Sequence, residues 1–313
     1  MSSPTLFSTR SRVRFLAAAG LGLAAGGFRF GNFALAQEST PAAEVSITMS
    51  AIEFSFDIPD QIPSGWVRVT MENKGAEAHH AQFLKLADGV TADDFQNTLL
   101  SEGEAALATV LAYGGAGVID PGSSSEAIVW LDPGDYVAVC FVSGADNVPH
   151  FAKGMLTPFS VVEGDGTSQP PVEDAAVELI DFGFKTLPAE FPAGKVTIKA
   201  TNSGTEMHEL TVLSPIEGVT VDEIIAMFSV PPASPESEAT MDHGDMATPA
   251  PEASGPPPFH FNGGLQGIMP GMTGYAVLDL APGEYIALCG IPSPANGGAP
   301  HFMLGMTATF AVK

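Results

Sequence analysis

Each half of the chain carries one cysteine, and a histidine and a methionine follow that cysteine at a similar distance. A further histidine precedes each cysteine. The two sets are His79, Cys140, His150 and Met155 in the first half and His208, Cys289, His301 and Met306 in the second. Two imidazoles, a thiolate and a thioether are the donors of a trigonal copper site with a weak axial methionine, because soft sulfur stabilises Cu(I) while imidazole accepts Cu(II). The sequence therefore predicts two copper sites.

These residues belong to an internal duplication. Residues 54–79 match residues 182–208 through a Phe-x-Phe pair, a proline, a glycine, an asparagine and a Gly-x-Glu-x-His motif, and residues 119–140 match 268–289 at a constant offset. Self-similarity of this length indicates two copies of one structural unit. The alignment also selects His79 rather than His80 as the first ligand. His79 matches His208, and the other side chains expected on the same face of the His208 strand are apolar, so this face points inward. His80 is expected to point outward.

Between these landmarks, apolar residues alternate with polar ones over short stretches bounded by Pro-Gly or Asn-x-Gly, which is typical of a β-sandwich. We expect an all-β chain with two tandem Greek-key sandwiches, each with a short helical insertion that opens at a Thr-x-x-acid capping box. The predicted domains are residues 45–162 and 177–313, joined by an acidic Gly/Pro linker at 163–176, with a low-complexity loop at 231–258 inside the second.

At this point the sequence resembles the cupredoxin family, plastocyanin-like, in tandem. The resemblance covers residues 45–162 and most of 177–312, and it implies one type 1 copper in each domain, up to two in all. Two departures stand out. Nine and eleven residues separate each cysteine from the following histidine, where two to four are usual in the family. His80 and Glu209 also occupy the place where the family commonly has Asn or Ser.

The cysteines have two other interpretations. An exported chain with two cysteines would ordinarily pair them in a disulfide, and buried thiols can also be inert members of a core. Each cysteine, however, occupies the same repeat position beside its own His-x4-Met, which favours copper ligation.

A second copper-binding segment is predicted inside the low-complexity loop. The residues Met241, His243 and Met246 resemble the His/Met-rich stretches of copper-handling proteins, and thioethers on a flexible acidic loop can capture Cu(I) transiently. The alternative is an ordinary linker. His260 has no evident partner and is expected to be structural.

Residues 1–36 have the three parts of an export signal: an Arg-bearing start, an apolar run from Phe15 to Phe28, and a small-residue cleavage site that ends at Ala36. The apolar run is shorter than the roughly 20 residues of a spanning helix, so no stable membrane insertion is expected. We expect export to the periplasm, cell surface or medium, with cleavage after Ala36.

The chain has 12 Lys and Arg against 36 Asp and Glu, a net charge of −24. The charge becomes −28 without the leader, since four arginines leave with it and 8 − 36 = −28. Such a polyanion repels phosphate backbones, which excludes nucleic-acid binding. The expected partners are a cationic redox protein or a copper acceptor.

The predicted function is non-catalytic single-electron transfer, with residues 149–151 and 300–302 as apolar docking edges. Multicopper oxidases and nitrite reductases resemble the tandem, but they link a type 1 copper to another metal through a histidine directly after the cysteine. Here Phe141 and Gly290 follow the cysteines, and the chain has no His-x-His. Copper storage, delivery or tolerance is the alternative, and a metal-free sandwich for adhesion or assembly is a third hypothesis.

Overall fold

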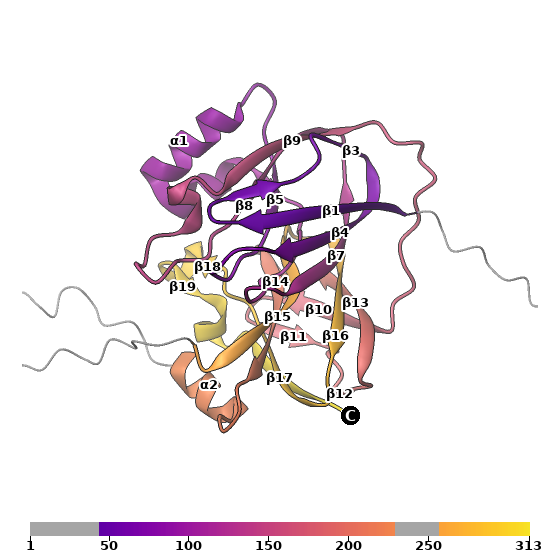
Figure 1. Ribbon diagram of the computed structural model, residues 1–313, viewed down its shortest axis with the longest axis vertical. Helices are drawn as coiled ribbons and strands as arrows, with labels where there is room; N and C mark the ends of the chain where they lie inside the picture. Colours follow the sequence, from indigo (N-terminus) through magenta and orange to yellow (C-terminus); the bar gives the residue numbers. More distant parts are fainter. Residues whose placement is uncertain (1–43, 229–256) are drawn as a thin grey trace, which may run out of the picture. The chain divides into compact units, whose positions relative to one another are not determined.

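The structure is a computed structural model that describes residues 44–228 and 257–313 (Figure 1). These residues form two β-sandwiches, so the predicted all-β fold is confirmed. None of the helices in the described ranges is long and apolar enough to cross a membrane. The predicted export signal at 1–36 and the segment with Met241, His243 and Met246 lie outside the described residues.

The first sandwich packs four strands against five. The first layer contains β2 (Ser55–Asp57), β1 (Val45–Ile52), β4 (Gly65–Asn73) and β7 (Ser124–Leu131) in spatial order. The second contains β3 (Gln61–Pro63), β9 (Leu156–Val162), β8 (Gly134–Val139), β5 (Gln82–Lys85) and β6 (Leu111–Ala112). Strand β1 runs parallel to β4 and β3 runs parallel to β9, whereas the other pairs are antiparallel.

The second sandwich repeats this arrangement. Its first layer contains β11 (Gly183–Lys185), β10 (Ala175–Ile180), β13 (Gly194–Asn202) and β16 (Thr273–Leu280). Its second contains β12 (Glu190–Phe191), β20 (Thr307–Val312), β17 (Gly283–Leu288), β14 (His208–Pro215) and β15 (Phe259–Ile268). A small additional hairpin pairs β18 (Pro292–Ser293) with β19 (Ala299–Pro300).

Alternation of apolar and polar residues determines which face of each strand is buried. In β4, Val67, Val69 and Met71 are buried while the residues between them are partly exposed, and β13 repeats this pattern. Side chains two residues apart lie on the same face of a strand, so the apolar set faces the opposite layer. Both strands end at a buried asparagine, Asn73 or Asn202.

The predicted helical insertions are present as α1 (Ala92–Glu102) and α2 (Val221–Phe228). Thr91 caps α1, since its hydroxyl accepts the Asp94 N–H while the Asp94 carboxylate accepts the Thr91 N–H. Thr220 and Glu223 form the same reciprocal pair before α2. The capping boxes read from the sequence therefore mark both helix starts correctly.

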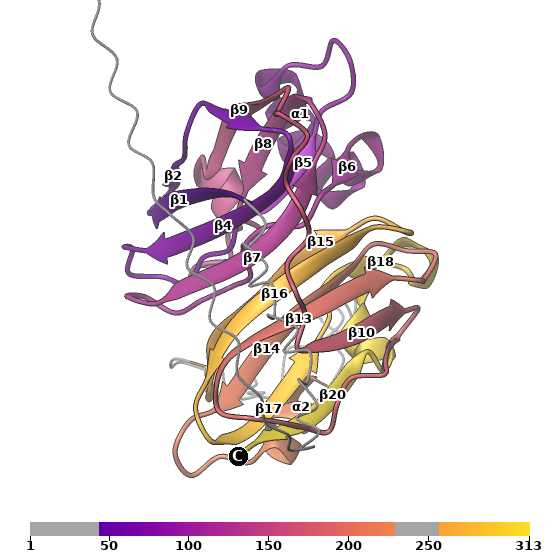
Figure 2. The same ribbon diagram turned by 90° about the vertical axis from the view of Figure 1, so that its right-hand side faces the viewer.

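The two sandwiches share one continuous sheet, because β7 pairs antiparallel with β16 (Figure 2). Beneath this junction, residues 113–119 bond to residues 262–268 in a nearly symmetric pattern. Gly114 N–H donates to the Gly267 carbonyl, and at the equivalent place Gly263 N–H donates to the Val118 carbonyl. Equivalent residues of the repeat thus face one another across the junction.

Candidate metal centres

The first cluster lies at one end of the first sandwich, where strand ends meet. Cys140 directly follows β8, His150 opens the 3₁₀ helix η2 (His150–Lys153), and His79 lies just before β5. Because β5 pairs with β8, the chain segments that carry His79 and Cys140 are adjacent. All three side chains are fully buried.

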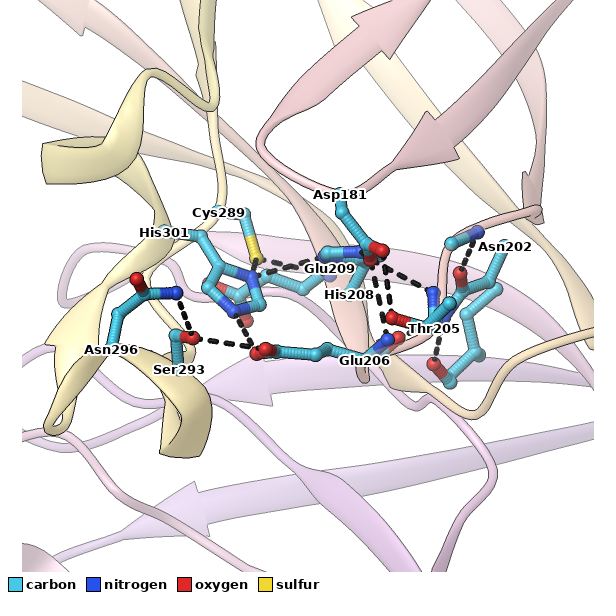
Figure 3. A network of polar contacts seen from close by, with 12 residues as sticks. Asp181, Asn202, Thr205, Glu206, His208, Glu209, Cys289, Ser293, Asn296 and His301 are labelled. Atoms are coloured by element: carbon cyan, nitrogen blue, oxygen red, sulfur yellow. Dashed lines mark hydrogen bonds and ion pairs between the residues drawn. The ribbon is translucent and has the colours of Figure 1, made fainter.

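The donor atoms of this cluster converge. The His79 and His150 Nδ1 atoms are 3.0 Å apart, and the Cys140 Sγ lies 3.9 Å and 3.5 Å from them, respectively. The second cluster, His208, Cys289 and His301, repeats the geometry (Figure 3), with 3.0 Å between the Nδ1 atoms and 3.3 Å from the Cys289 Sγ to the His301 Nδ1. In each cluster the donor atoms all lie within 4.8 Å of one another.

Met155 and Met306 are fully buried beside the cysteines. The Cys140 N–H donates to the Met155 carbonyl at 3.2 Å, and the Met155 N–H donates to the His150 carbonyl at 2.9 Å. The second site has the same two bonds. Gly154, at φ 104°, ends η2 in a left-handed conformation that favours glycine, so the His-x4-Met segment turns back toward the cysteine.

Every histidine of the two clusters has a carboxylate on its outer nitrogen. The Nε2 atoms contact Glu53 (3.3 Å from His79), Glu77 (2.7 Å from His150), Asp181 (2.9 Å from His208) and Glu206 (2.9 Å from His301). A carboxylate only accepts hydrogen bonds, so Nε2 carries the proton and the Nδ1 lone pair is directed to the centre of the cluster. This is the tautomer that binds a metal through Nδ1.

Two of these carboxylates are strongly stabilised in the ionised form. Burial opposes ionisation of Glu53, but the backbone N–H groups of Glu77 and Ala76, together with His79, outweigh it and lower the Glu53 pKa to about 2. Asp181 also has a lowered pKa, because hydrogen bonds from Thr205, His208 and the backbone outweigh its burial. Burial, followed by the charge of the neighbouring His150 imidazole, lowers the pKa of His79.

The thiols lie in an environment that keeps them protonated without a metal. Burial raises the pKa of Cys140 to about 12, although backbone N–H groups of His80 and Val142 donate to its sulfur. Burial and the charge of Glu209 raise the pKa of Cys289. A metal must therefore displace the thiol proton, and the N–H groups then stabilise the thiolate.

The separations also agree with one bound ion. Metal–nitrogen distances of about 2.0 Å and a metal–sulfur distance of about 2.3 Å in a trigonal plane would place the donors roughly 3.5–3.7 Å apart. The five donor–donor distances given above run from 3.0 to 3.9 Å. Both clusters fit type 1 copper.

No protein-family model and no curated protein matches the chain. Among solved structures, it is similar to auracyanin from Roseiflexus castenholzii, with 23% identity over 38% of this chain and 98% of that one and a TM-score of 0.27. It is also similar to a copper nitrite reductase from Nitrosomonas europaea, with 16% identity over 87% and 94% of the two chains and a TM-score of 0.24. A multicopper oxidase has 15% identity over 86% and 88%, with a TM-score of 0.23.

The residue after the first histidine holds the residue after the cysteine in both type 1 sites. The His80 Nε2 accepts the Phe141 N–H at 2.7 Å, and the Glu209 carboxylate accepts the Gly290 N–H at 2.7 Å. The expectation that His80 points outward was incomplete: His80 is partly buried and lines a cavity between the sandwiches.

Residues 149–151 and 300–302 were expected to form apolar docking edges. For the two histidines in these segments this expectation was wrong, because their imidazoles are not exposed. His150 and His301 are fully buried, and Glu77 and Glu206 occupy their outer edges. The imidazoles are therefore not exposed for docking, and a partly exposed carboxylate lies next to each of them. His260, by contrast, is 60% exposed, and its Nδ1 lies 2.8 Å from Asp120, so it pairs on the surface.

Sequence reasoning missed the four outer carboxylates, although the repeat contains the signal. Glu53 and Asp181 both directly precede the Phe-x-Phe pair, and Glu77 and Glu206 both lie two residues before the first histidine. Acidic residues at matching positions of both copies, next to proposed ligands, were therefore visible. Their contact with Nε2 needs the fold, because Glu53 and His79 are 26 residues apart.

Proposed function

We propose that this chain is a copper protein that transfers single electrons, with one type 1 copper in each sandwich. The proposed ligands are His79, Cys140, His150 and Met155 in the first and His208, Cys289, His301 and Met306 in the second. One observation supports the proposal: in each sandwich the two histidines and the cysteine converge, and each histidine has a carboxylate on its Nε2 that leaves Nδ1 free to bind a metal.

This arrangement suits an ion that changes charge without changing its surroundings. When bound, copper supplies the one-electron change, and the protein supplies a fixed set of donors. Burial of the ligands excludes water from the site, and the outer carboxylates and Asn73 or Asn202 hold the ligand loops in place. The side chain of Asn73 bonds to the carbonyls of Glu77 and Ile119, and Asn202 makes the equivalent bonds.

A non-catalytic role is part of this proposal. Phe141 and Gly290 follow the two cysteines, so no imidazole leads from a thiolate to a further metal. Within residues 44–228 and 257–313, the groups of three or more possible ligands are the two type 1 clusters themselves. Both features support electron transfer between proteins rather than reduction of oxygen or nitrite.

The proposed partner is a cationic redox protein, and the proposed location is outside the cytoplasm. The net charge of −24 and the acidic residues around both sites would steer a basic protein at low salt. Residues 1–36 support export, and amino-terminal sequencing of protein recovered from the producing cells would test it. We expect Gln37 as the first residue, whereas an uncleaved start would refute processing at Ala36.

The function is tested by reducing the copper-loaded protein and mixing it with a basic cytochrome c at increasing ionic strength. We expect rapid reversible oxidation whose rate constant falls as salt rises, because opposite charges attract less when screened. An acidic cytochrome is the matched control and should react slowly. If copper instead leaves for a Cu(I) chelator while the cytochrome stays oxidised, the storage or delivery alternative is correct.

A further inference from the structure

A cavity of about 410 Å³ lies where the two sandwiches meet. Its walls pair equivalent residues of the repeat: His80 with Glu209, and Phe141 with Gly290. These residues directly follow proposed ligands, so the cavity adjoins both type 1 sites, but none of the proposed ligands lines it. The volume is within the range of about 300–1,000 Å³ that is usual for small-molecule pockets.

Most of the cavity wall is apolar. Val118 and Val142 come from the first sandwich, and Met207, Leu288 and Ile291 come from the second. Apolar walls favour an uncharged organic molecule, because a small hydrated ion would lose its water without gaining enough polar contacts. The carboxyl group of Glu209 further disfavours an anion.

One buried donor in the wall has no partner. Gln266 on β15 is 1% exposed, and its Nε2 makes no hydrogen bond with any of the residues that the structure describes. Gln82, which also lines the cavity, differs: its Nε2 donates to the carbonyls of Phe83, Gly114 and Gly267. An unpaired buried donor is costly, so the Gln266 amide indicates a place for an acceptor atom of a ligand.

The donor has no counterpart across the junction. The position equivalent to Gln266 is Gly117, where an added Cβ would lie 2.3 Å from the Gly264 nitrogen. No side chain fits there without a backbone shift. Polar side chains line the cavity from both sandwiches, but the unpaired Gln266 amide is present on the second alone. A ligand with an acceptor at one end therefore matches the cavity better than a symmetric one.

We propose that this cavity binds a small, neutral, mostly apolar organic molecule whose carbonyl oxygen accepts a hydrogen bond from the Gln266 Nε2. The molecule lies between the two type 1 sites, against the residues that follow their ligands. Binding requires no copper, so the inference does not rest on the proposed electron transfer. The proposal commits to a ligand class, a neutral ketone or quinone-like carbonyl compound, and to one hydrogen-bond donor.

The test uses two probes on the copper-free protein: prodan, a neutral naphthalene ketone whose emission shifts to the blue in apolar surroundings, and naphthalene as a competitor without the carbonyl. We expect one saturable prodan site per chain. Val118→Phe fills the cavity and should abolish binding. Gln266→Met keeps the approximate size but removes the donor, and it should weaken prodan binding about tenfold without weakening naphthalene.

Val162→Phe and Gln61→Met make the same changes at exposed positions outside the cavity, and both should bind prodan as the original chain does. Circular dichroism establishes that each variant folds. The proposal is overturned if prodan does not saturate, if Val118→Phe and Gln266→Met both leave its affinity unchanged, or if Gln266→Met keeps the original preference for the ketone. None of these outcomes depends on copper.

Discussion

The two type 1 sites have the same donor atoms, but different residues hold them. In the first site, the imidazole of His80 fixes the residue after the cysteine; in the second, the carboxyl group of Glu209 does so. The longer loop of the second site adds a chain of hydrogen bonds from Asn296 through Ser293 to Glu206. Ligand geometry was thus retained between the copies while the charge near the sulfur changed.

The largest expected effect is the loss of copper from one site while the other site keeps its copper. Cys140→Ser should remove copper from the first sandwich and Cys289→Ser from the second, because a serine hydroxyl does not replace a thiolate as a soft ligand. Each variant should retain about one copper per chain by metal analysis. Loss of both coppers from one substitution would show that the sites are not independent.

Replacing the buried asparagines, Asn73 in the first site and Asn202 in the second, tests whether each ligand loop depends on its own asparagine to the same extent. Asn73→Ala and Asn202→Ala each remove two hydrogen bonds that the side chain donates to carbonyls and one that it accepts from a backbone N–H. We expect each change to lower the free energy of unfolding by about 2–4 kcal/mol, measured with urea. A loss below 0.5 kcal/mol for either would mean that its loop is held by other contacts.

A tyrosine distinguishes the first sandwich at alkaline pH. Burial, and then Asp132, which accepts a hydrogen bond from the Tyr113 hydroxyl, raise the pKa of Tyr113 to about 12. The repeat equivalent of Tyr113 is Asn262. The folded chain keeps this proton when the unfolded chain loses it, so stability present below pH 10 falls between about pH 10 and 12, by roughly 2–3 kcal/mol.

Tyr113→Phe should be less stable at pH 8 but should lose less stability over that alkaline interval. The measurement is the free energy of unfolding in urea, at pH 8 and at the alkaline end of that interval. Equal alkaline losses in the variant and the original chain would contradict the assignment.

The smallest effect concerns the reduction potential of the second site. Burial raises the pKa of Glu209 to about 7, despite hydrogen bonds from Gly290 and Thr211, so this group is mostly ionised at pH 8. Its charge next to Cys289 favours Cu(II). Glu209→Gln should therefore raise the potential of that site by on the order of 50 mV, close to 1 kcal/mol for one electron.

His80→Gln is the matched control in the first site. Burial, together with the neighbouring imidazoles, lowers the pKa of His80 to about 3, so the substitution changes no charge at pH 8. We expect a much smaller shift in that site by voltammetry. Equal shifts in both variants would show that geometry rather than charge sets the difference.

Much of the fold follows from local sequence patterns. Alternation in β4 and β13, and the capping boxes before α1 and α2, are short-range signals that the sequence displays directly. The junction is different, because the pairing of β7 with β16 joins residues about 150 positions apart and depends on how the two copies pack. No periodicity in a single strand specifies its neighbour in another sandwich.

The ligand set could be read from spacing and repetition, but its surroundings could not. The repeat places His79 with His208 and Cys140 with Cys289, whereas the carboxylates reach Nε2 only after β-strand pairing brings distant loops together. The buried position of His150 also depends on Glu77, 73 residues away. The types and spacing of the donors are visible in the sequence, whereas the groups that orient the donors are known only from the fold.

The most direct test of the central claim is the copper content of the purified, copper-loaded protein, measured together with its visible absorption and electron paramagnetic resonance spectra. We expect two coppers per chain, an intense thiolate-to-copper absorption band, and the narrow copper hyperfine splitting of a type 1 site for both. A colourless protein, or one whose copper gives only the wide splitting of nitrogen and oxygen ligation, would contradict binding by Cys140 and Cys289.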